Sequence, residues 1–123
     1  MIKLIVYWYP KCSTCKKALS FLDKKKIPYE LKNIKEEIPS EEEINRWIKE
    51  YSIPIKKLFN TSGLIYKELN LKENLEKYTL EEKIKLLSSN GMLIKRPICV
   101  LKNTILVGFK EKEWEEVLGD ENA

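Results

Sequence analysis

The first third of the chain alternates between short apolar runs and a longer amphipathic stretch. Residues 2–8 are mostly apolar with β-branched members, a pattern typical of a buried strand, and Pro10 ends the run. Over about residues 13–25, apolar positions recur every three or four residues with lysines between them, which predicts an amphipathic helix. Pro28 interrupts this pattern, and residues 29–34 alternate like a second strand. Because a strand, a helix and a strand in this order form a βαβ unit, we expect the two strands to be parallel.

The middle third has the pattern of several short helices. Ser40 with Glu43, and Thr79 with Glu82, have the spacing of capping boxes, so a helix should begin after each pair. A proline and an Asn-Thr-Ser-Gly turn separate further helical patterns between these two. We therefore expect a helical insert over about residues 40–90, made of the segments 41–51, 55–59, 64–71 and 80–89.

The last third predicts two strands and a helix. Residues 98–101 and 104–109 are apolar runs separated by a two-residue turn, which indicates an antiparallel hairpin, and a helix follows over about 110–118. One mixed four-stranded sheet flanked by helices accounts for the whole order of elements. We predict an α/β protein with a thioredoxin-like fold, forming a single domain over residues 1–123 that includes the insert.

The composition narrows the class of protein. With 123 residues, of which 43% are hydrophobic and 34% charged, the chain is long enough for one domain with a real core. The net charge of +4 comes almost entirely from lysines, with Arg46 and Arg96 as the two arginines. Since these lysines are interleaved with glutamates, we expect a solvated surface and no direct contact with nucleic acid.

The N-terminal pattern predicts a cytoplasmic protein. The apolar run near Met1 is too short to span a membrane and lacks the cleavage site of a signal peptide. Cysteines in the cytoplasm are normally reduced, and three of them are too few for a disulfide scaffold. We therefore interpret these cysteines as reactive thiols and not as parts of structural disulfides. We also expect a monomer.

Cys12 and Cys15 form a Cys-x-x-Cys pair between the first predicted strand and the first predicted helix. The chain has no histidine, so Cys–His and Ser–His nucleophile pairs are excluded. A structural zinc site needs four ligands, and only Cys99 and carboxylates are left to complete one, so we expect no metal. Two inert buried cysteines are the plainer alternative, which suits Cys15 on the apolar helix face better than Cys12 in a polar loop.

The position of Cys12 favours redox chemistry. It lies where the first turn of a helix leaves N–H groups unpaired, and the positive end of the helix dipole favours a thiolate. Lys11, Lys16 and Lys17 add positive potential. Such a thiolate attacks disulfides or electrophiles, and Cys15, one helical turn further on, can then resolve the mixed disulfide.

Arg96 and Pro97 are the second candidate feature. Thioredoxin-like folds place a proline, usually with a cis peptide bond, at the head of the third strand and facing the active cysteine, and Pro97 stands directly before that predicted strand. Arg96 would then lie near Cys12, where its guanidinium can bind a carboxylate or oxyanion. A surface arginine at a strand end is the plainer alternative. We expect Cys99, inside the apolar strand, to pack in the core, with a third redox partner as the alternative.

The chain resembles the ArsC/Spx family over essentially its whole length. The resemblance rests on CSTCKKA from Cys12, NTSG from Asn60 with YKEL from Tyr66, GMLIKRPI from Gly91, and LVGF from Leu106. This family of small thioredoxin-fold proteins includes glutaredoxin-coupled arsenate reductases and the Spx regulators of RNA polymerase.

The resemblance implies a site with one arginine where arsenate reductases have three. Cys12 matches their nucleophile and Arg96 one of the arginines that surround the oxyanion. The positions of the other two hold Asn60 and Phe109–Lys110, and Lys11 or Lys110 could replace these arginines only as point charges.

Spx regulators share the Cys-x-x-Cys and the Arg-Pro, and they bind the C-terminal domain of the RNA polymerase α subunit. Their acidic, glycine-containing segment is not matched by residues 51–57.

The leading hypothesis is therefore a thiol–disulfide oxidoreductase with Cys12 as nucleophile, Cys15 as resolving thiol, Arg96 as anion anchor and Pro97 as platform for the substrate. It implies no bound metal or cofactor, and an external reductant: a glutaredoxin, a thioredoxin or a low-molecular-weight thiol. Arsenate reduction and an Spx-like switch are the alternatives.

Overall fold

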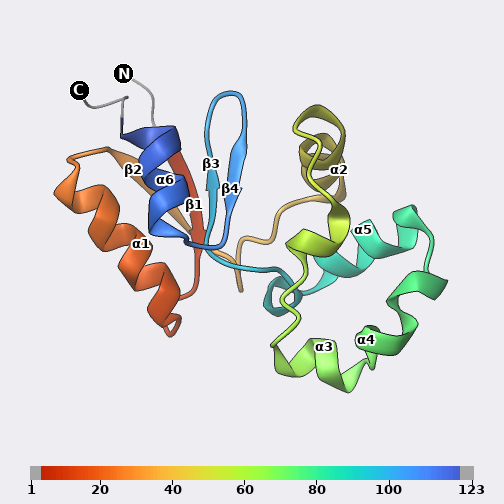
Figure 1. Cartoon of the computed structure of the whole chain (residues 1–123). Coiled ribbons are helices and arrows are strands. Elements are labelled where there is room, and N and C mark those ends of the chain that lie inside the picture. Colours follow the sequence, from red (N-terminus) through yellow and green to blue (C-terminus); the bar gives the residue numbers. More distant parts are fainter. Residues whose placement is uncertain (1–3, 120–123) are drawn as a thin grey trace. The chain divides into compact units, whose positions relative to one another are not determined.

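The computed structural model describes residues 4–119, which fall into two compact units (Figure 1). The sheet unit comprises the described residues up to Asn33 and from Arg96 onward, and the helical unit comprises Ile34–Lys95. The prediction that both units belong to one domain stays a prediction. No helix between residues 4 and 119 is long and apolar enough to cross a membrane.

The sheet unit holds a four-stranded mixed sheet with the strand order β2-β1-β3-β4. β1 and β2 are parallel, whereas β3 is antiparallel to both β1 and β4, so the predicted βαβ unit, hairpin and α/β fold are confirmed. Residues 2 and 3 of the first predicted strand lie outside the described residues. The elements of this unit are β1 (Leu4–Trp8), α1 (Ser13–Lys24), β2 (Tyr29–Asn33), β3 (Ile98–Val100), β4 (Ile105–Val107) and α6 (Glu111–Leu118).

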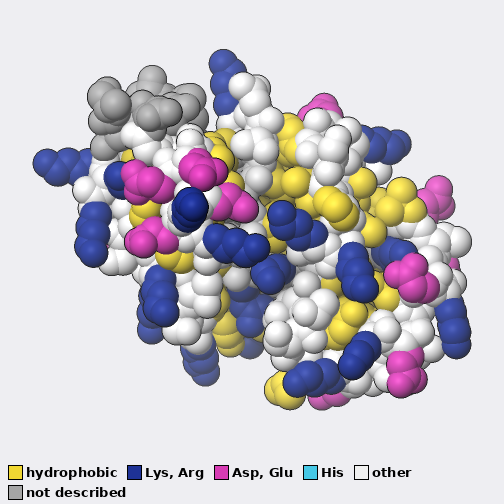
Figure 2. Space-filling model, in the orientation of Figure 1, with side chains coloured by type: hydrophobic (Ala, Val, Ile, Leu, Met, Phe, Trp, Pro, Cys, Tyr) yellow, Lys and Arg dark blue, Asp and Glu magenta, His cyan; other side chains and the backbone are white. Residues whose placement is uncertain are grey.

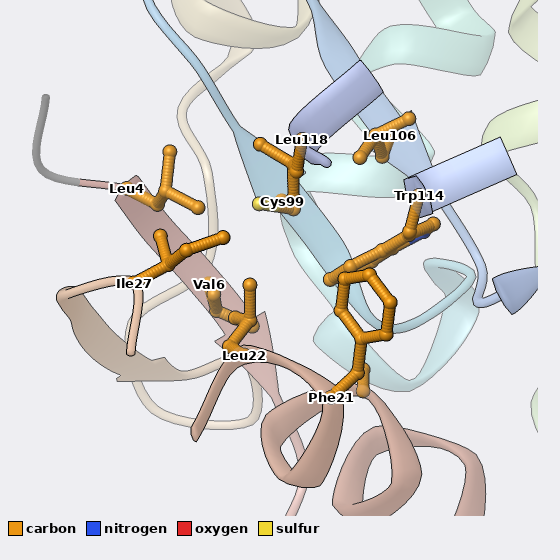
Figure 3. Packing of buried hydrophobic residues seen from close by; sticks show 10 residues of the cluster. Leu4, Val6, Phe21, Leu22, Ile27, Cys99, Leu106, Trp114 and Leu118 are labelled. Atoms are coloured by element: carbon orange, nitrogen blue, oxygen red, sulfur yellow. The ribbon is translucent and has the colours of Figure 1, made fainter. Parts of the chain in front are cut away.

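The core of the sheet unit lies between one face of the sheet and the helices α1 and α6 (Figure 3). Phe21 of α1 and Trp114 of α6 meet edge to face, with 6.2 Å between ring centroids. Each fully buried aliphatic or aromatic side chain contributes about 1.5–3 kcal/mol relative to an exposed one. This packing fixes α1, and with it the cysteine pair at its start. The buried cluster consists of Leu4, Val6, Ala18, Phe21, Leu22, Ile27, Cys99, Leu106, Trp114 and Leu118.

The helical unit contains the predicted helices, with differences around Asn70 and an additional short helix and 3-10 turn over residues 71–77. The Ser40 hydroxyl accepts the N–H of Glu43, and Thr79 and Glu82 form a complete capping box. The prediction of one helix over 64–71 is wrong, because Asn70 adopts a left-handed conformation (φ 54°) and divides the segment. The helices are α2 (Glu41–Glu50), α3 (Leu64–Glu68), α4 (Leu71–Asn74) and α5 (Leu80–Ser89), with 3-10 turns at Ile55–Leu58, Leu75–Lys77 and Gly91–Leu93.

Charged side chains are spread over the surface of both units. On the face drawn in Figure 2, lysines and arginines lie among aspartates and glutamates. The interleaving of lysine and glutamate in the sequence therefore corresponds to a mixed surface on this face, as expected for solvated helices.

Candidate redox site

Cys12 occupies the N-cap of α1. Its N–H donates to the carbonyl oxygen of Tyr9 at 3.0 Å, which closes the turn that follows β1. Its Sγ accepts the N–H of Cys15 at 3.2 Å, in the place where an N-cap serine or aspartate offers an oxygen. The sulfur thus lies at the positive end of a twelve-residue helix. Cys12 is partly exposed, so a substrate can reach it.

Cys15 lies one turn further along α1 and is fully buried. Burial, followed by a side-chain hydrogen bond with Cys12, raises the pKa of its thiol to about 12. The backbone of Tyr9 and the charge of Arg96 act in the opposite direction and lower the same pKa. At neutral pH Cys15 is therefore protonated. The two cysteines, both free thiols here, have different roles open to them.

The sheet brings Arg96 and Pro97 to the same end of β1 as the cysteine loop. Tyr7 pairs with Ile98, so the antiparallel register carries Arg96 toward Tyr9. The Arg96–Pro97 peptide bond is cis, as predicted, and the Pro97 carbonyl accepts the N–H of Gly108 at 2.8 Å. The Arg96 guanidinium carbon lies 5.2 Å from the centroid of the Tyr9 ring. The contact with Tyr9, whose carbonyl accepts the N–H of Cys12, places Arg96 at the end of the sheet that carries the cysteine pair, and its charge lowers the pKa of Cys15.

Comparison with known proteins identifies the family. A model of the ArsC family matches residues 7–117. The chain belongs to the ArsC family.

Two relatives illustrate the similarity within the ArsC family: the uncharacterized protein YusI and the regulator Spx. YusI of Bacillus subtilis is 44% identical over 94% of this chain and 98% of its own length. The global transcriptional regulator Spx of Enterococcus faecalis is 28% identical over 94% of this chain and 86% of its own length.

Solved structures of the family share the fold. An ArsC family related protein from Bacteroides fragilis is 46% identical and superimposes with a TM-score of 0.88, over 93% of this chain and 96% of that one. A possible arsenate reductase from Streptococcus mutans is 38% identical with a TM-score of 0.84, over 94% and 99%. The thioredoxin-like architecture predicted from the sequence is therefore confirmed.

The other positions that the ArsC resemblance singled out lie in varied surroundings. Asn60 belongs to the helical unit, where its N–H donates to the carbonyl of Leu93 at 2.7 Å. Lys11 is exposed in the turn directly before Cys12, and Lys110 is exposed at the N-cap of α6. Between residues 4 and 119, no three cysteine or carboxylate side chains are grouped so as to hold a metal ion.

Tyr9 is the site residue that sequence reasoning missed. Its carbonyl holds the N–H of Cys12, and its ring lies against the guanidinium of Arg96. An aromatic residue directly after β1, in the loop that leads to the cysteine pair, was the available signal. It gained meaning only once the register of β3 placed Arg96 opposite it.

Cys99 belongs to the core of the sheet unit and not to the candidate redox site. It is fully buried in β3, within the cluster formed with α1 and α6, as the sequence predicted. Burial raises the pKa of its thiol to about 12. A protonated thiol without solvent access packs as a small apolar group.

Alkaline pH is expected to destabilise the protein through Cys99. Between the ordinary thiol pKa of 9.0 and about 12, the unfolded chain ionises this cysteine while the folded chain keeps it protonated. Its contribution to stability is therefore complete below about pH 9 and is lost as the pH rises to about 12. Between about pH 8 and about pH 11, a Cys99→Ala variant should lose about 2–3 kcal/mol less of its free energy of unfolding than the wild type. Urea denaturation at the two pH values measures this, and equal losses would contradict the assignment.

Proposed function

We propose that this ArsC-family protein is a thiol–disulfide oxidoreductase in which Cys12 attacks the substrate and Cys15 resolves the mixed disulfide. The observation that carries the proposal is the asymmetry of the pair. Cys12 is partly exposed at a helix N-cap, whereas Cys15 is buried and has a raised pKa. Such a pair suits a two-step exchange. The first thiol must be accessible to the substrate, and the second must stay unreactive until the mixed disulfide has formed.

In the first step, the Cys12 thiolate attacks one sulfur of a disulfide R–S–S–R′. A bond forms between Cys12 Sγ and the sulfur of R, the substrate S–S bond breaks, and R′–S⁻ leaves with the electron pair and takes a proton from solvent. Before the attack, the N–H of Cys15 stabilises the negative sulfur from 3.2 Å away. This hydrogen bond and the N-terminus of α1 keep the nucleophile in place.

In the second step, Cys15 attacks Cys12 Sγ and releases R–S⁻. Once Cys12 is in a mixed disulfide, its negative charge no longer raises the pKa of Cys15. The backbone of Tyr9 and the charge of Arg96 still lower that pKa, so the proton of Cys15 passes more easily through solvent to the leaving thiolate. The product is a Cys12–Cys15 disulfide, and two electrons have passed to the substrate.

Turnover then requires an external thiol. A glutaredoxin, a thioredoxin or a low-molecular-weight thiol would reduce the Cys12–Cys15 disulfide by the same exchange in reverse, with no bound metal or organic cofactor. The protein would act as a monomer in the cytoplasm, where thiols are kept reduced. Arg96 would anchor an anionic group of the substrate, and Pro97, directly before β3, would support the substrate chain.

The stoichiometry of thiol release tests this mechanism. With excess glutathione disulfide and no other thiol, each wild-type chain should release two molecules of glutathione, one in each step. A Cys15→Ser chain should release one and stop as the mixed disulfide. A Cys99→Ala chain serves as the control and should release two. Release of two molecules by Cys15→Ser, or of only one by the wild type, would overturn the assignment of the resolving thiol.

Arsenate reduction is the second candidate function, favoured by the position of Arg96 beside the cysteine pair. A relative with 38% identity carries the name of a possible arsenate reductase. Arsenate would be reduced to arsenite by two electrons from glutathione by way of glutaredoxin. With a single arginine matched, we expect turnover no higher than that of a Cys12→Ser variant. A higher rate would make arsenate a substrate.

An Spx-like switch is the third candidate, favoured by the alignment with Spx over 94% of the chain. In this case the Cys12–Cys15 disulfide would alter binding to the C-terminal domain of the RNA polymerase α subunit. We expect no retention on that domain in either redox state, because residues 51–57 do not match the Spx segment. Retention that depends on the redox state would favour the switch over the enzyme.

A further inference from the structure

Tyr9 contacts both components of the candidate redox site. The centroid of its ring lies 5.2 Å from the guanidinium carbon of Arg96, within the range of a cation–π contact. Its carbonyl oxygen accepts the N–H of Cys12 at 3.0 Å. The same residue therefore fixes the loop that carries the nucleophile and supports the arginine. Because the two contacts use different parts of Tyr9, a substitution that keeps the backbone can remove one and leave the other.

The contact with the Tyr9 ring gives Arg96 a defined position. An arginine side chain has several rotatable bonds, and their freedom must be lost before the guanidinium can bind an anion. A cation–π contact with the Tyr9 ring restrains the position of the guanidinium carbon, which lies 5.2 Å from the ring centroid. A planar carboxylate is the group that the edge of a guanidinium matches, with two parallel hydrogen bonds.

We propose that Tyr9 is a positioning residue that holds Arg96 beside Cys12 and thereby gives the site a preference for substrates with a carboxylate near the reacting atom. The proposal rests on the proposed function in so far as the natural substrate is a disulfide. The substrate class is then a carboxylate-bearing disulfide, such as a disulfide of an acidic peptide. The charge of Arg96 acts on Cys15 as well, so the guanidinium is close enough to attract an anion that approaches the pair.

Two alkylating reagents with the same reacting carbon test this proposal. Iodoacetate carries a carboxylate and iodoacetamide carries a neutral amide in its place. With either one, the Cys12 thiolate attacks the methylene carbon, an S–C bond forms, the C–I bond breaks and iodide leaves. The ratio of the iodoacetate rate to the iodoacetamide rate cancels the thiolate fraction of Cys12. It therefore reports the preference for a carboxylate alone.

Variants of Tyr9 and Arg96 distinguish the contact between the Tyr9 ring and Arg96 from an effect of the Tyr9 hydroxyl. Tyr9→Leu and Arg96→Gln should each lower the rate ratio by about threefold or more, whereas Tyr9→Phe, which keeps the ring, should leave it unchanged. If Tyr9 acts through Arg96, the double variant Tyr9→Leu/Arg96→Gln should be no lower than Arg96→Gln alone. Tyr9→Met, with a flexible apolar side chain, replaces Tyr9→Leu if thermal unfolding shows that the latter does not fold.

A ratio in Tyr9→Leu equal to that of the wild type would overturn the proposal, as would full additivity in the double variant. Loss of the ratio in Tyr9→Phe would move the effect from the ring to the hydroxyl and would also overturn it. Alkylation needs no disulfide substrate, so these outcomes are independent of the thiol-release experiment. If thiol release fails while the rate ratios behave as expected, the proposed function is wrong and the role of Tyr9 stands.

Discussion

Replacing Cys12 with serine should lower the rate of thiol release from glutathione disulfide by at least about 10³-fold. A hydroxyl is not ionised at neutral pH, so the variant lacks the nucleophile, and the buried, protonated Cys15 cannot replace it. The fold should be unaffected, because serine is among the preferred N-cap residues and its oxygen can accept the N–H that Cys12 Sγ accepts now. Stopped-flow detection of released glutathione, together with the thermal unfolding midpoint, measures both effects.

The control for this experiment is Cys99→Ala, which removes a thiol from the core and leaves the pair intact. It should keep the wild-type rate within about twofold, because Cys99 takes no part in the proposed exchange. A Cys12→Ser protein that still released glutathione at more than about a tenth of the wild-type rate would show that another cysteine attacks first. A similar loss in both variants would indicate a general structural effect.

Replacing Gly91 with alanine should destabilise the protein by about 3 kcal/mol or more. An added Cβ would lie 2.7 Å from the carbonyl carbon of Ile34 and closer still to its carbonyl oxygen. Both atoms belong to the backbone of the helical unit, so neither can rotate away as the end of a side chain could. The backbone segments at Gly91 and Ile34 must therefore move apart, although Gly91 is buried. Urea denaturation measures the loss.

Gly63→Ala is the matched control within the same unit. Its Cβ would meet Asn60 Nδ2 at 2.7 Å, but this atom is the end of a side chain that can move. The Asn60 amide makes only a long contact with the carbonyl of Met92, at 3.5 Å. We expect a loss of about 1 kcal/mol or less. Equal losses in the two variants would contradict the view that Gly91 is required by a backbone contact.

The sequence contained the elements that build the site. Apolar periodicity located β1, α1 and the hairpin, because burial of one face imposes a period on the chain. The position of Cys12 before the predicted helix and of Cys15 on its apolar face indicated that Cys12 would be the more exposed and Cys15 the buried thiol. Arg96–Pro97 was identified because a proline fits best at the start of a strand.

Features that depend on tertiary contacts could not be predicted from the periodicity or from the positions of the motifs. Asn70 sits in an amphipathic pattern that continues on both sides, and nothing in the pattern says that its backbone becomes left-handed. In the sequence, Gly91 indicates the end of a helix. In the structure, its backbone lies close to the backbone of Ile34, which is far away in the sequence. The contact of Tyr9 with Arg96 likewise depends on the register between β1 and β3, which is known only once the sheet is formed.

The most direct test of the account is to find which sulfur forms the first bond to a substrate. Brief reaction of Cys15→Ser and Cys12→Ser proteins with glutathione disulfide, followed by peptide mapping in a mass spectrometer, locates the attached glutathione. We expect glutathione on Cys12 in the first variant, no attachment at Cys15 in the second, and a Cys12–Cys15 disulfide in the wild type. Attachment at Cys15 of the Cys12→Ser protein, as fast as at Cys12 of the other, would contradict this expectation.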